Sequence, residues 1–180
     1  MKIDITREIE MAQGVHATVK ESTLRVKGPK GELERSFVYP GITLVVEGNK
    51  IVLQALKATK REKMIVGSFE AHITNMVKGV QEVHTYKLKI CSGHFPMNVT
   101  TSGNEFVVKN FLGEAVPRRM TFDKGVDVKI KDTEIVVSGA DKELAGRTAA
   151  KIEQLCRITN RDLRVFQDGC YIVQKAGKEI

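Results

Sequence analysis

The sequence predicts an α+β fold of two tandem, structurally similar domains, each a mostly antiparallel sheet packed on one amphipathic helix. An internal repeat is the first observation: the pattern Lys-x-x-x-Gly-Glu begins at Lys27 and again at Lys109. The order of elements is the second, because a turn, a β-branched strand and a helical run follow the pattern in both copies. We therefore expect one domain at residues 1–82 and another at 83–180.

In the first half, five short runs have the composition of strands and precede a helical run. Gly28 opens a Gly-Pro-Lys-Gly segment, which predicts a turn between two strands because proline suits the first central turn position. Ile65, Phe69 and Ile73 then recur at helical spacing. The predicted strands are residues 15–20, 23–27, 33–38, 42–47 and 50–55.

The second half repeats this order of strands and helix. Leu144, Thr148 and Ile152 recur at helical spacing after the last strand. A Gly-His-Phe-Pro segment at Gly93 interrupts the strand pattern, and we expect it to be a non-repeated loop of the kind that carries specialised contacts. The predicted strands are residues 86–91, 98–101, 106–109, 126–130 and 134–137.

Gly67 and Gly146 occupy matching early positions in the two predicted helices. A glycine inside a helix costs about 1 kcal/mol relative to alanine unless close packing compensates. We therefore expect each helix to press against its sheet at its glycine.

Positive charge concentrates at the end of the chain. Between Arg147 and Lys178 there are seven cations and three anions, which supply +4 of the formal net charge of +7. Such a segment suits a polyanionic partner, although a solvated basic face is the alternative. The candidate phosphate-binding cations are Arg147, Lys151, Arg157, Arg161, Arg164, Lys175 and Lys178.

The cations begin on the second helix and continue past its end. Arg147 and Lys151 lie four residues apart, which places them on one polar face opposite the apolar stripe. Asp168 and the glycine after it predict a turn that returns the chain as a strand. For Phe166 and Tyr171 we favour anchoring of the tail in the core over stacking on RNA bases.

The inventory of reactive side chains argues against an enzyme. The four histidines are scattered, and the one metal-like spacing, Cys91-x-x-His94, lacks a second pair nearby. The sequence contains no phosphate-binding glycine loop and no nucleophile elbow. Glu32 and Glu114, the acids of the repeat, are explained more simply by a shared hairpin. We expect no catalytic residue, metal, cofactor or small-molecule substrate.

Composition indicates a globular protein outside membranes. With 180 residues and 42% hydrophobic residues, the chain can build one large core or two smaller ones. No run approaches the roughly 20 apolar residues that a membrane helix needs. An odd number of cysteines, three at wide spacing, argues against a disulfide framework and fits a reducing compartment. We expect a cytoplasmic protein.

A longer motif covers the end of the second helix and the basic tail. It resembles the C-terminal signature of the universal large-subunit ribosomal protein family six, in its archaeal and eukaryotic branch. Cys170 is the one departure, at a position where an aliphatic residue is usual. The resemblance extends along essentially the whole chain. The matching residues are Gln154, Ile158, Arg161, Arg164, Phe166, Asp168, Gly169, Cys170, Tyr171, Ile172 and Lys175.

This resemblance implies a structural constituent of the large ribosomal subunit that binds large-subunit (23S-type) rRNA near the sarcin-ricin loop. It implies that the second domain carries most of the RNA contact and supports the region where translational GTPases dock. His94, in a loop that the resemblance covers, joins the seven cations as a candidate RNA contact. The expected partners are large-subunit rRNA, neighbouring large-subunit ribosomal proteins and, nearby, translational GTPases.

A duplicated adaptor that binds a protein partner is the main alternative. It explains the repeat and the mixed charge, but it does not explain the arginines after the second helix. Salt dependence separates the two hypotheses, because binding through several phosphates weakens steeply as salt rises and an apolar protein interface does not.

Overall fold

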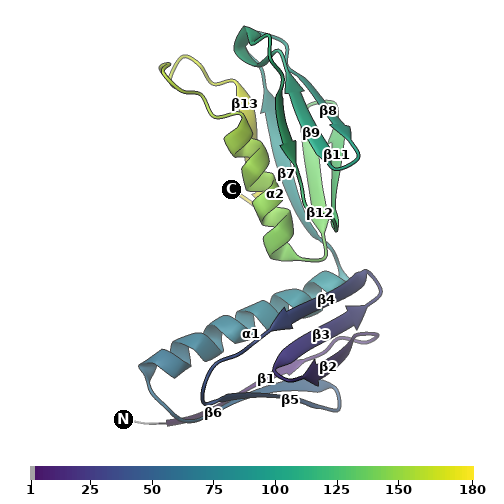
Figure 1. The fold of residues 1–180 in the computed structure, drawn as a ribbon, viewed down its shortest axis with the longest axis vertical. Coiled ribbons are helices and arrows are strands. Elements are labelled where there is room, and N and C mark those ends of the chain that lie inside the picture. The colour runs from purple at the N-terminus through teal and green to yellow at the C-terminus, as the bar shows by residue number, and fades with distance from the viewer. Residues whose placement is uncertain (1–2) are drawn as a thin grey trace. The chain divides into compact units, whose positions relative to one another are not determined.

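The computed structural model describes residues 3–180 and divides them into two compact units, one ending at Val83 and the other beginning at His84. Each unit contains strands that pair only in antiparallel fashion, together with one long helix (Figure 1). The predicted α+β class with tandem similar domains is confirmed. Within each unit the strands form two sheets.

In the first unit one sheet has the order β1-β6-β5 and the other has the order β2-β3-β4. Helix α1 packs against strands of both sheets. Leu24, Ile51 and Ile73 are completely buried and bring the two sheets and the helix into one core. The bounds are β1 Ile3–Glu10, β2 His16–Lys20, β3 Thr23–Gly28, β4 Gly31–Ser36, β5 Ile42–Glu47, β6 Lys50–Ala58 and α1 Lys60–Gln81.

Helix α1 begins at a capping box. The side-chain oxygen of Thr59 accepts a hydrogen bond from the Arg61 amide at 3.3 Å, and the Glu62 carboxylate accepts one from the Thr59 amide at 2.8 Å. These contacts satisfy amides that the first turn of a helix leaves unpaired. Across the described residues 3–180, no helix is long and apolar enough to span a membrane.

The predicted Gly-Pro-Lys-Gly turn joins β3 to β4. Gly28 and Gly31 face each other as the last pair of the hairpin, and the Lys30 amide donates to the Val80 carbonyl at 2.9 Å. A Cβ atom on Gly28 would lie 2.7 Å from that carbonyl oxygen. Glycine is therefore required here because α1 ends against the hairpin.

The second unit contains a five-stranded sheet of order β11-β12-β7-β13-β14 and a three-stranded sheet of order β10-β9-β8. Helix α2 packs against strands of both. Leu88, Phe106 and Ile152 lie in the core and are completely buried. The bounds are β7 His84–Cys91, β8 Asn98–Ser102, β9 Glu105–Lys109, a 3₁₀ turn Phe111–Gly113, β10 Arg118–Thr121, β11 Val126–Lys131, β12 Glu134–Gly139, α2 Lys142–Leu155, β13 Gly169–Lys175 and β14 Lys178–Glu179.

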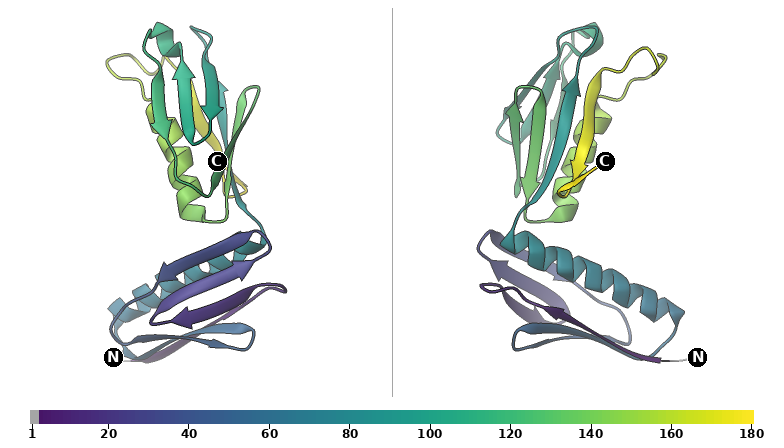
Figure 2. Two further views of the ribbon diagram at one scale, coloured as in Figure 1. Left: turned by 45° about the vertical axis from the view of Figure 1, so that its right-hand side comes forward. Right: turned by 180° about the vertical axis from the view of Figure 1, so that it is seen from behind.

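Strand β13 pairs antiparallel with β7, on the edge of β7 opposite β12 (Figure 2). Cys91 faces Gly169, and Leu88 faces Ile172. In the first unit β1 holds the corresponding place beside β6, but none of the described strands pairs with its other edge. The tail of the chain therefore extends one sheet of the second unit only.

Three strands were not predicted: β1, β10 and β14. Strand β10 reads Arg-Arg-Met-Thr, which lacks an apolar alternation, and its pairing with β9 holds it in the sheet. The loop at Gly93 was expected to be an insertion, and this was wrong. Residues 92–97 connect β7 to β8 just as residues 11–15 connect β1 to β2 in the first unit.

The two helix glycines differ in how closely their helices pack against neighbouring residues. A Cβ atom on Gly146 would lie 2.9 Å from the hydroxyl oxygen of Tyr86, so α2 presses against β7 there as expected. A Cβ atom on Gly67 would meet nothing within 4 Å, so the same expectation for α1 was wrong. Gly67 lies on the exposed face of its helix.

Candidate nucleic-acid interface

Residues 157–168, here called the arginine loop, connect α2 to β13. The loop carries Arg157, Arg161 and Arg164 and projects beyond the end of α2 (Figures 1 and 2). Asn160 has a φ of 59°, the left-handed conformation that asparagine tolerates in turns. Contacts with residues outside the loop hold both of its ends.

Arg118 of β10 holds the start of the loop. Its Nη1 donates to the carbonyl oxygens of Leu155 at 2.8 Å and Arg157 at 3.1 Å, which lie in and just after the last turn of α2. Its Nε and Nη2 donate to the Glu114 carboxylate at 2.8 and 2.6 Å. The hydrogen bond to Arg118 lowers the pKa of Glu114 below its ordinary value. Arg118 thus satisfies carbonyls that a helix C-terminus leaves unpaired.

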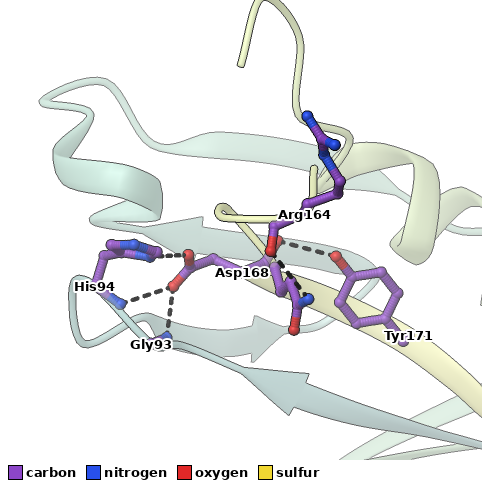
Figure 3. A network of polar contacts seen from close by, with 6 residues as sticks. Gly93, His94, Arg164, Asp168 and Tyr171 are labelled. Carbon is purple, nitrogen blue, oxygen red and sulfur yellow. Dashed lines mark hydrogen bonds and ion pairs between the residues drawn. The ribbon is translucent and has the colours of Figure 1, made fainter. Parts of the chain in front are cut away.

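Asp168 holds the end of the loop, and only 1% of its surface is exposed. Its Oδ1 accepts from the amides of Gly93 at 2.6 Å and His94 at 3.0 Å, and its Oδ2 lies 2.6 Å from His94 Nδ1 (Figure 3). Burial raises the pKa of Asp168, but the hydrogen bonds from His94 and Gly93 outweigh it and leave the pKa lowered. Since an ionised carboxylate only accepts, Nδ1 of His94 donates to it.

Phe166 links the loop to His94. The two rings are stacked, with centroids 4.8 Å apart and planes inclined by 25°. The guanidinium carbon of Arg161 lies 4.8 Å from the centroid of the same Phe166 ring. Arg161 is therefore held by a cation–π contact, which favours arginine over lysine.

Contacts within the loop shape its middle. The Phe166 amide donates to the Asp162 carbonyl at 2.9 Å, and the Arg164 guanidinium pairs with the Asp162 carboxylate at 2.8 Å. That contact lowers the pKa of Asp162 and raises the pKa of Arg164. The Arg164 side chain is still 90% exposed. Within residues 3–180, neither Arg157 nor Arg161 has a carboxylate oxygen within 4.0 Å.

Arg147 and Lys151 lie on the exposed face of α2, as the helical spacing predicted. Lys151 is 3.9 Å from an oxygen of Asp123, whereas Arg147 has no carboxylate oxygen within 4.0 Å in the described chain. At about 1.5 Å per residue, Arg147 is about 15 Å along the chain from Arg157. These two cations extend the basic surface along the helix.

Lys175 and Lys178 do not join this group. They face each other where β13 turns into β14, and the adjacent Gly177 amide donates to the Thr85 carbonyl at 3.3 Å. The arginine loop meets the other end of β13, where Gly169 faces Cys91. A strand rises by about 3.3 Å per residue, so the two lysines lie roughly 20 Å from Asp168.

A hollow of about 1000 Å³ lies between the arginine loop, the end of α2, the start of β13 and residues 92–94. Leu163, Val165 and Tyr171 line it and are exposed, Tyr171 to 40%. Arg157 and His94 also line it. The hollow therefore combines apolar and aromatic surface with donors, which suits a flat polar group such as a base.

Cys156 and Cys170 also line the hollow, with their sulfur atoms 3.7 Å apart. Both are buried free thiols. The hydrogen bond with Cys156 and burial together raise the pKa of Cys170, so this cysteine stays protonated and packs as a small apolar residue. Among the described residues, no group of three His, Cys, Asp or Glu side chains is placed to hold a metal ion.

The structure changes the interpretation of four residues. Phe166 packs on His94 and Arg161 outside the apolar core, and Tyr171 is exposed at the hollow, so the expected core anchoring of both was wrong. Asp168 was expected to form only a turn. Arg118 was missed because its partners lie 37 and 39 residues away in the sequence.

Comparison with known proteins agrees with the duplicated fold. The sequence model of the family described as Ribosomal protein L6 matches residues 12–83 and 95–169, once in each unit. The large ribosomal subunit protein uL6 of Methanococcus vannielii is 45% identical over 174 residues, which cover 97% of this chain and 96% of that protein. The protein of the same name from Methanosarcina mazei is 44% identical over 173 residues, which cover 96% and 98%. Matched in both units and along nearly its whole length, the chain belongs to the Ribosomal protein L6 family.

Proposed function

We propose that this protein binds large-subunit rRNA through its second unit, near the sarcin-ricin loop, and supports the region where translational GTPases dock. The family consists of structural proteins of the large ribosomal subunit and not of enzymes. The observation that carries the proposal is the arginine loop, which is fixed at both ends and presents Arg157 and Arg161 without a carboxylate oxygen within 4.0 Å among the described residues. Such side chains are available to phosphate oxygens.

The mechanism is electrostatic and geometric. Arg157, Arg161 and Arg164 neutralise phosphates where RNA strands approach each other, and their planar guanidinium groups can donate two hydrogen bonds to one phosphate. Because Arg118 and Asp168 fix the ends of the loop before RNA arrives, less conformational entropy is lost on binding. Arg147 and Lys151 extend the contact along α2.

The hollow gives this surface a place for an unpaired nucleotide. Tyr171 offers an exposed aromatic face, and Leu163 and Val165 add apolar surface beside it. Double-stranded A-form RNA hides the edges of its bases in a deep, narrow groove, so a protein reaches bases mainly in loops and bulges. We infer that the second unit recognises RNA shape, with one splayed base in the hollow.

The remaining partners follow from assembly into the subunit. The first unit, without an arginine loop, is the part we assign to neighbouring large-subunit ribosomal proteins. Lys175 and Lys178, about 20 Å from the loop along β13, reach a separate stretch of RNA. Assembly into ribosomes also implies a cytoplasmic protein.

The test is affinity for a transcript of the sarcin-ricin domain across a salt series. Arg161→Glu and Arg164→Glu should each weaken binding about tenfold or more and lower the salt slope by about 1 to 2, because each removes a phosphate contact and adds repulsion. Lys50→Glu in the first unit, which makes the same charge change, is the control and should have a much smaller effect. Equal effects of all three changes would show that charge acts diffusely. Weak wild-type binding that is indifferent to salt would favour a protein partner.

A further inference from the structure

We propose that Asp168 is a positioning residue for RNA binding, which holds Arg161 in its binding orientation through His94 and Phe166. This inference rests on the proposed function, because it assigns a role within the same surface. Asp168 is almost fully buried and carries a negative charge, so its carboxylate cannot itself bind a phosphate. Its contribution must pass through the groups that it touches.

The first link joins the two loops that border the hollow. Asp168 lies at the end of the arginine loop, and both of its carboxylate oxygens bind the 92–97 loop, through the amides of Gly93 and His94 and through the His94 ring (Figure 3). Three charge-assisted hydrogen bonds to one buried carboxylate fix both the position of the His94 backbone and the direction of its ring.

The second link runs from His94 to the cation. The His94 ring stacks on Phe166, and the Phe166 ring holds the Arg161 guanidinium, each at 4.8 Å. An arginine with several rotatable bonds would otherwise lose rotamer freedom on meeting RNA. The stack restrains Arg161 before binding, so the contact to phosphate costs less.

The rest of the loop does not supply this restraint. Its other hydrogen bonds connect loop residues to one another. They run from the Arg164, Val165 and Phe166 amides and the Arg164 guanidinium to Asp162, and from Gln167 to the Arg164 carbonyl. Beyond the Arg118 contacts at Arg157, the described hydrogen bonds that tie residues 158–168 to other elements of the unit are those of Asp168 with the 92–97 loop and the Tyr171 hydroxyl.

An electrostatic role and a positioning role predict opposite changes in RNA affinity when the Asp168 side chain is removed. Replacing it with alanine makes the protein more positive by one charge, which on electrostatic grounds alone strengthens binding to RNA. If Asp168 acts by positioning, the same replacement weakens binding, because Arg161 and Phe166 lose their support. Asp127→Ala is the matched control, since Asp127 is an exposed strand residue of the same unit, and its one ion pair among the described residues is with Lys129.

The experiment measures affinity of the full chain for the sarcin-ricin transcript over a salt series. We expect Asp168→Ala to bind about tenfold more weakly, which corresponds to ordering two or three side chains on binding. Asp127→Ala should bind as well as the wild type or slightly better. Asp168→Asn makes the same charge change, but its side-chain oxygen can still accept from the amides of Gly93 and His94. Its affinity should therefore lie between those of Asp168→Ala and the wild type. Asp168→Ala that binds as tightly as Asp127→Ala overturns the proposal.

A second pair of variants keeps the test decisive if Asp168→Ala does not fold. His94→Ala removes the ring but leaves the backbone amides bound to Asp168, whereas His94→Phe restores a ring that can stack on Phe166. We expect His94→Ala to weaken binding severalfold and His94→Phe to recover part of it, because phenylalanine restores the stack on Phe166 but not the hydrogen bond to Asp168. A His94→Ala variant that binds as tightly as the wild type would overturn the link through Phe166.

The outcomes separate this proposal from the proposed function. If wild-type binding is weak and insensitive to salt, both fail. If wild-type binding is tight and Arg161→Glu abolishes it, while Asp168→Ala and His94→Ala leave it intact, only the positioning role fails.

Discussion

The two units share one plan up to the end of their helices and diverge beyond that point. In both, a first strand pairs with the strand before the helix, a three-stranded hairpin sheet comes between them, and the helix packs against both sheets. After α1 the chain passes directly to the next unit. After α2 it forms the arginine loop and then adds β13 and β14 to the edge of β7.

This difference locates the candidate RNA-binding surface within the second unit. Most of its cations lie in segments that the first unit lacks. The shared framework supplies Arg147 and Lys151 on α2 and the anchors, Arg118 and the 92–97 loop. The acids of the repeat show the same contrast. Glu32 pairs with exposed Arg25 on its own hairpin, whereas Glu114 holds the arginine that caps α2. The tail of the second unit thus carries most of the cations, and positions shared by both units support it.

The largest effects should come from removing a fully buried side chain at a matched place in the core of each unit. Ile73 on α1 and Ile152 on α2 are both completely buried. Either one replaced by alanine should lower the free energy of unfolding of its own unit by about 2–5 kcal/mol, from lost burial and a residual cavity. Hydrogen–deuterium exchange, read separately for each unit, measures this. Only Ile152→Ala should also weaken RNA binding, and equal loss of binding in both variants would contradict the assignment to the second unit.

A smaller effect distinguishes the two arginines of the repeat hairpins. Arg118, with a side chain that is 25% exposed, makes four hydrogen bonds, including two to carbonyls at the end of α2. Arg118→Ala should therefore cost about 1.5–3 kcal/mol, measured by urea unfolding. Arg25→Ala removes only exposed ion pairs and should leave the unfolding midpoint nearly unchanged. Similar midpoints for the two variants would show that the helix cap contributes little.

Replacing the two helix glycines, Gly67 and Gly146, by alanine should change the stability of their units in opposite directions. Gly146→Ala places a methyl group against Tyr86, whose hydroxyl donates to the Lys142 carbonyl at 3.2 Å, and should destabilise the second unit by about 1–2 kcal/mol. Gly67→Ala meets open space on an exposed helix face and should stabilise the first unit by about 0.5–1 kcal/mol. Thermal unfolding of the two variants checks both signs, and a stabilising Gly146→Ala would contradict the close packing of α2.

The smallest expected effect is the loss of the Asp168 contacts when this carboxylate is protonated at low pH. The pKa of Asp168 is lowered from 3.8, so its contribution to stability is fully present above pH 3.8 and is lost as the pH falls through its folded value. The amide signals of Gly93 and His94 should therefore shift below pH 3.8 in an NMR titration. Shifts that end above about pH 5 would exclude Asp168 as their source.

The sequence was sufficient to predict the duplication, the α+β class and the positions of most strands. Those predictions rest on local patterns, such as the alternation before Gly28 and the helical spacing up to Ile152. Strand β10 could not be found in this way, because its pairing with β9, and not its composition, places it in a sheet.

The candidate site was predicted less completely than the fold. Its cations stand out in the sequence, and their contact with RNA stays a prediction. Their supports do not stand out, because Arg118 and Asp168 act on partners distant in sequence, and burial of a charge becomes visible only in three dimensions. An aspartate directly before a strand is a weak signal for a buried anchor, since the same pattern usually marks a turn.

Because β13 lies near the end of the chain, the sheet of the second unit can be completed only when synthesis is almost finished. A chain emerges from synthesis N-terminus first and its domains fold as units, so the first unit has all its strands while the second is still being made. Strand β7 is made early in the second unit, but its partner β13 comes from the last residues of the chain. During that interval one edge of β7 is open to wrong pairing. Lys87 and Lys89, exposed on this strand, carry the charges that discourage such pairing until the tail arrives.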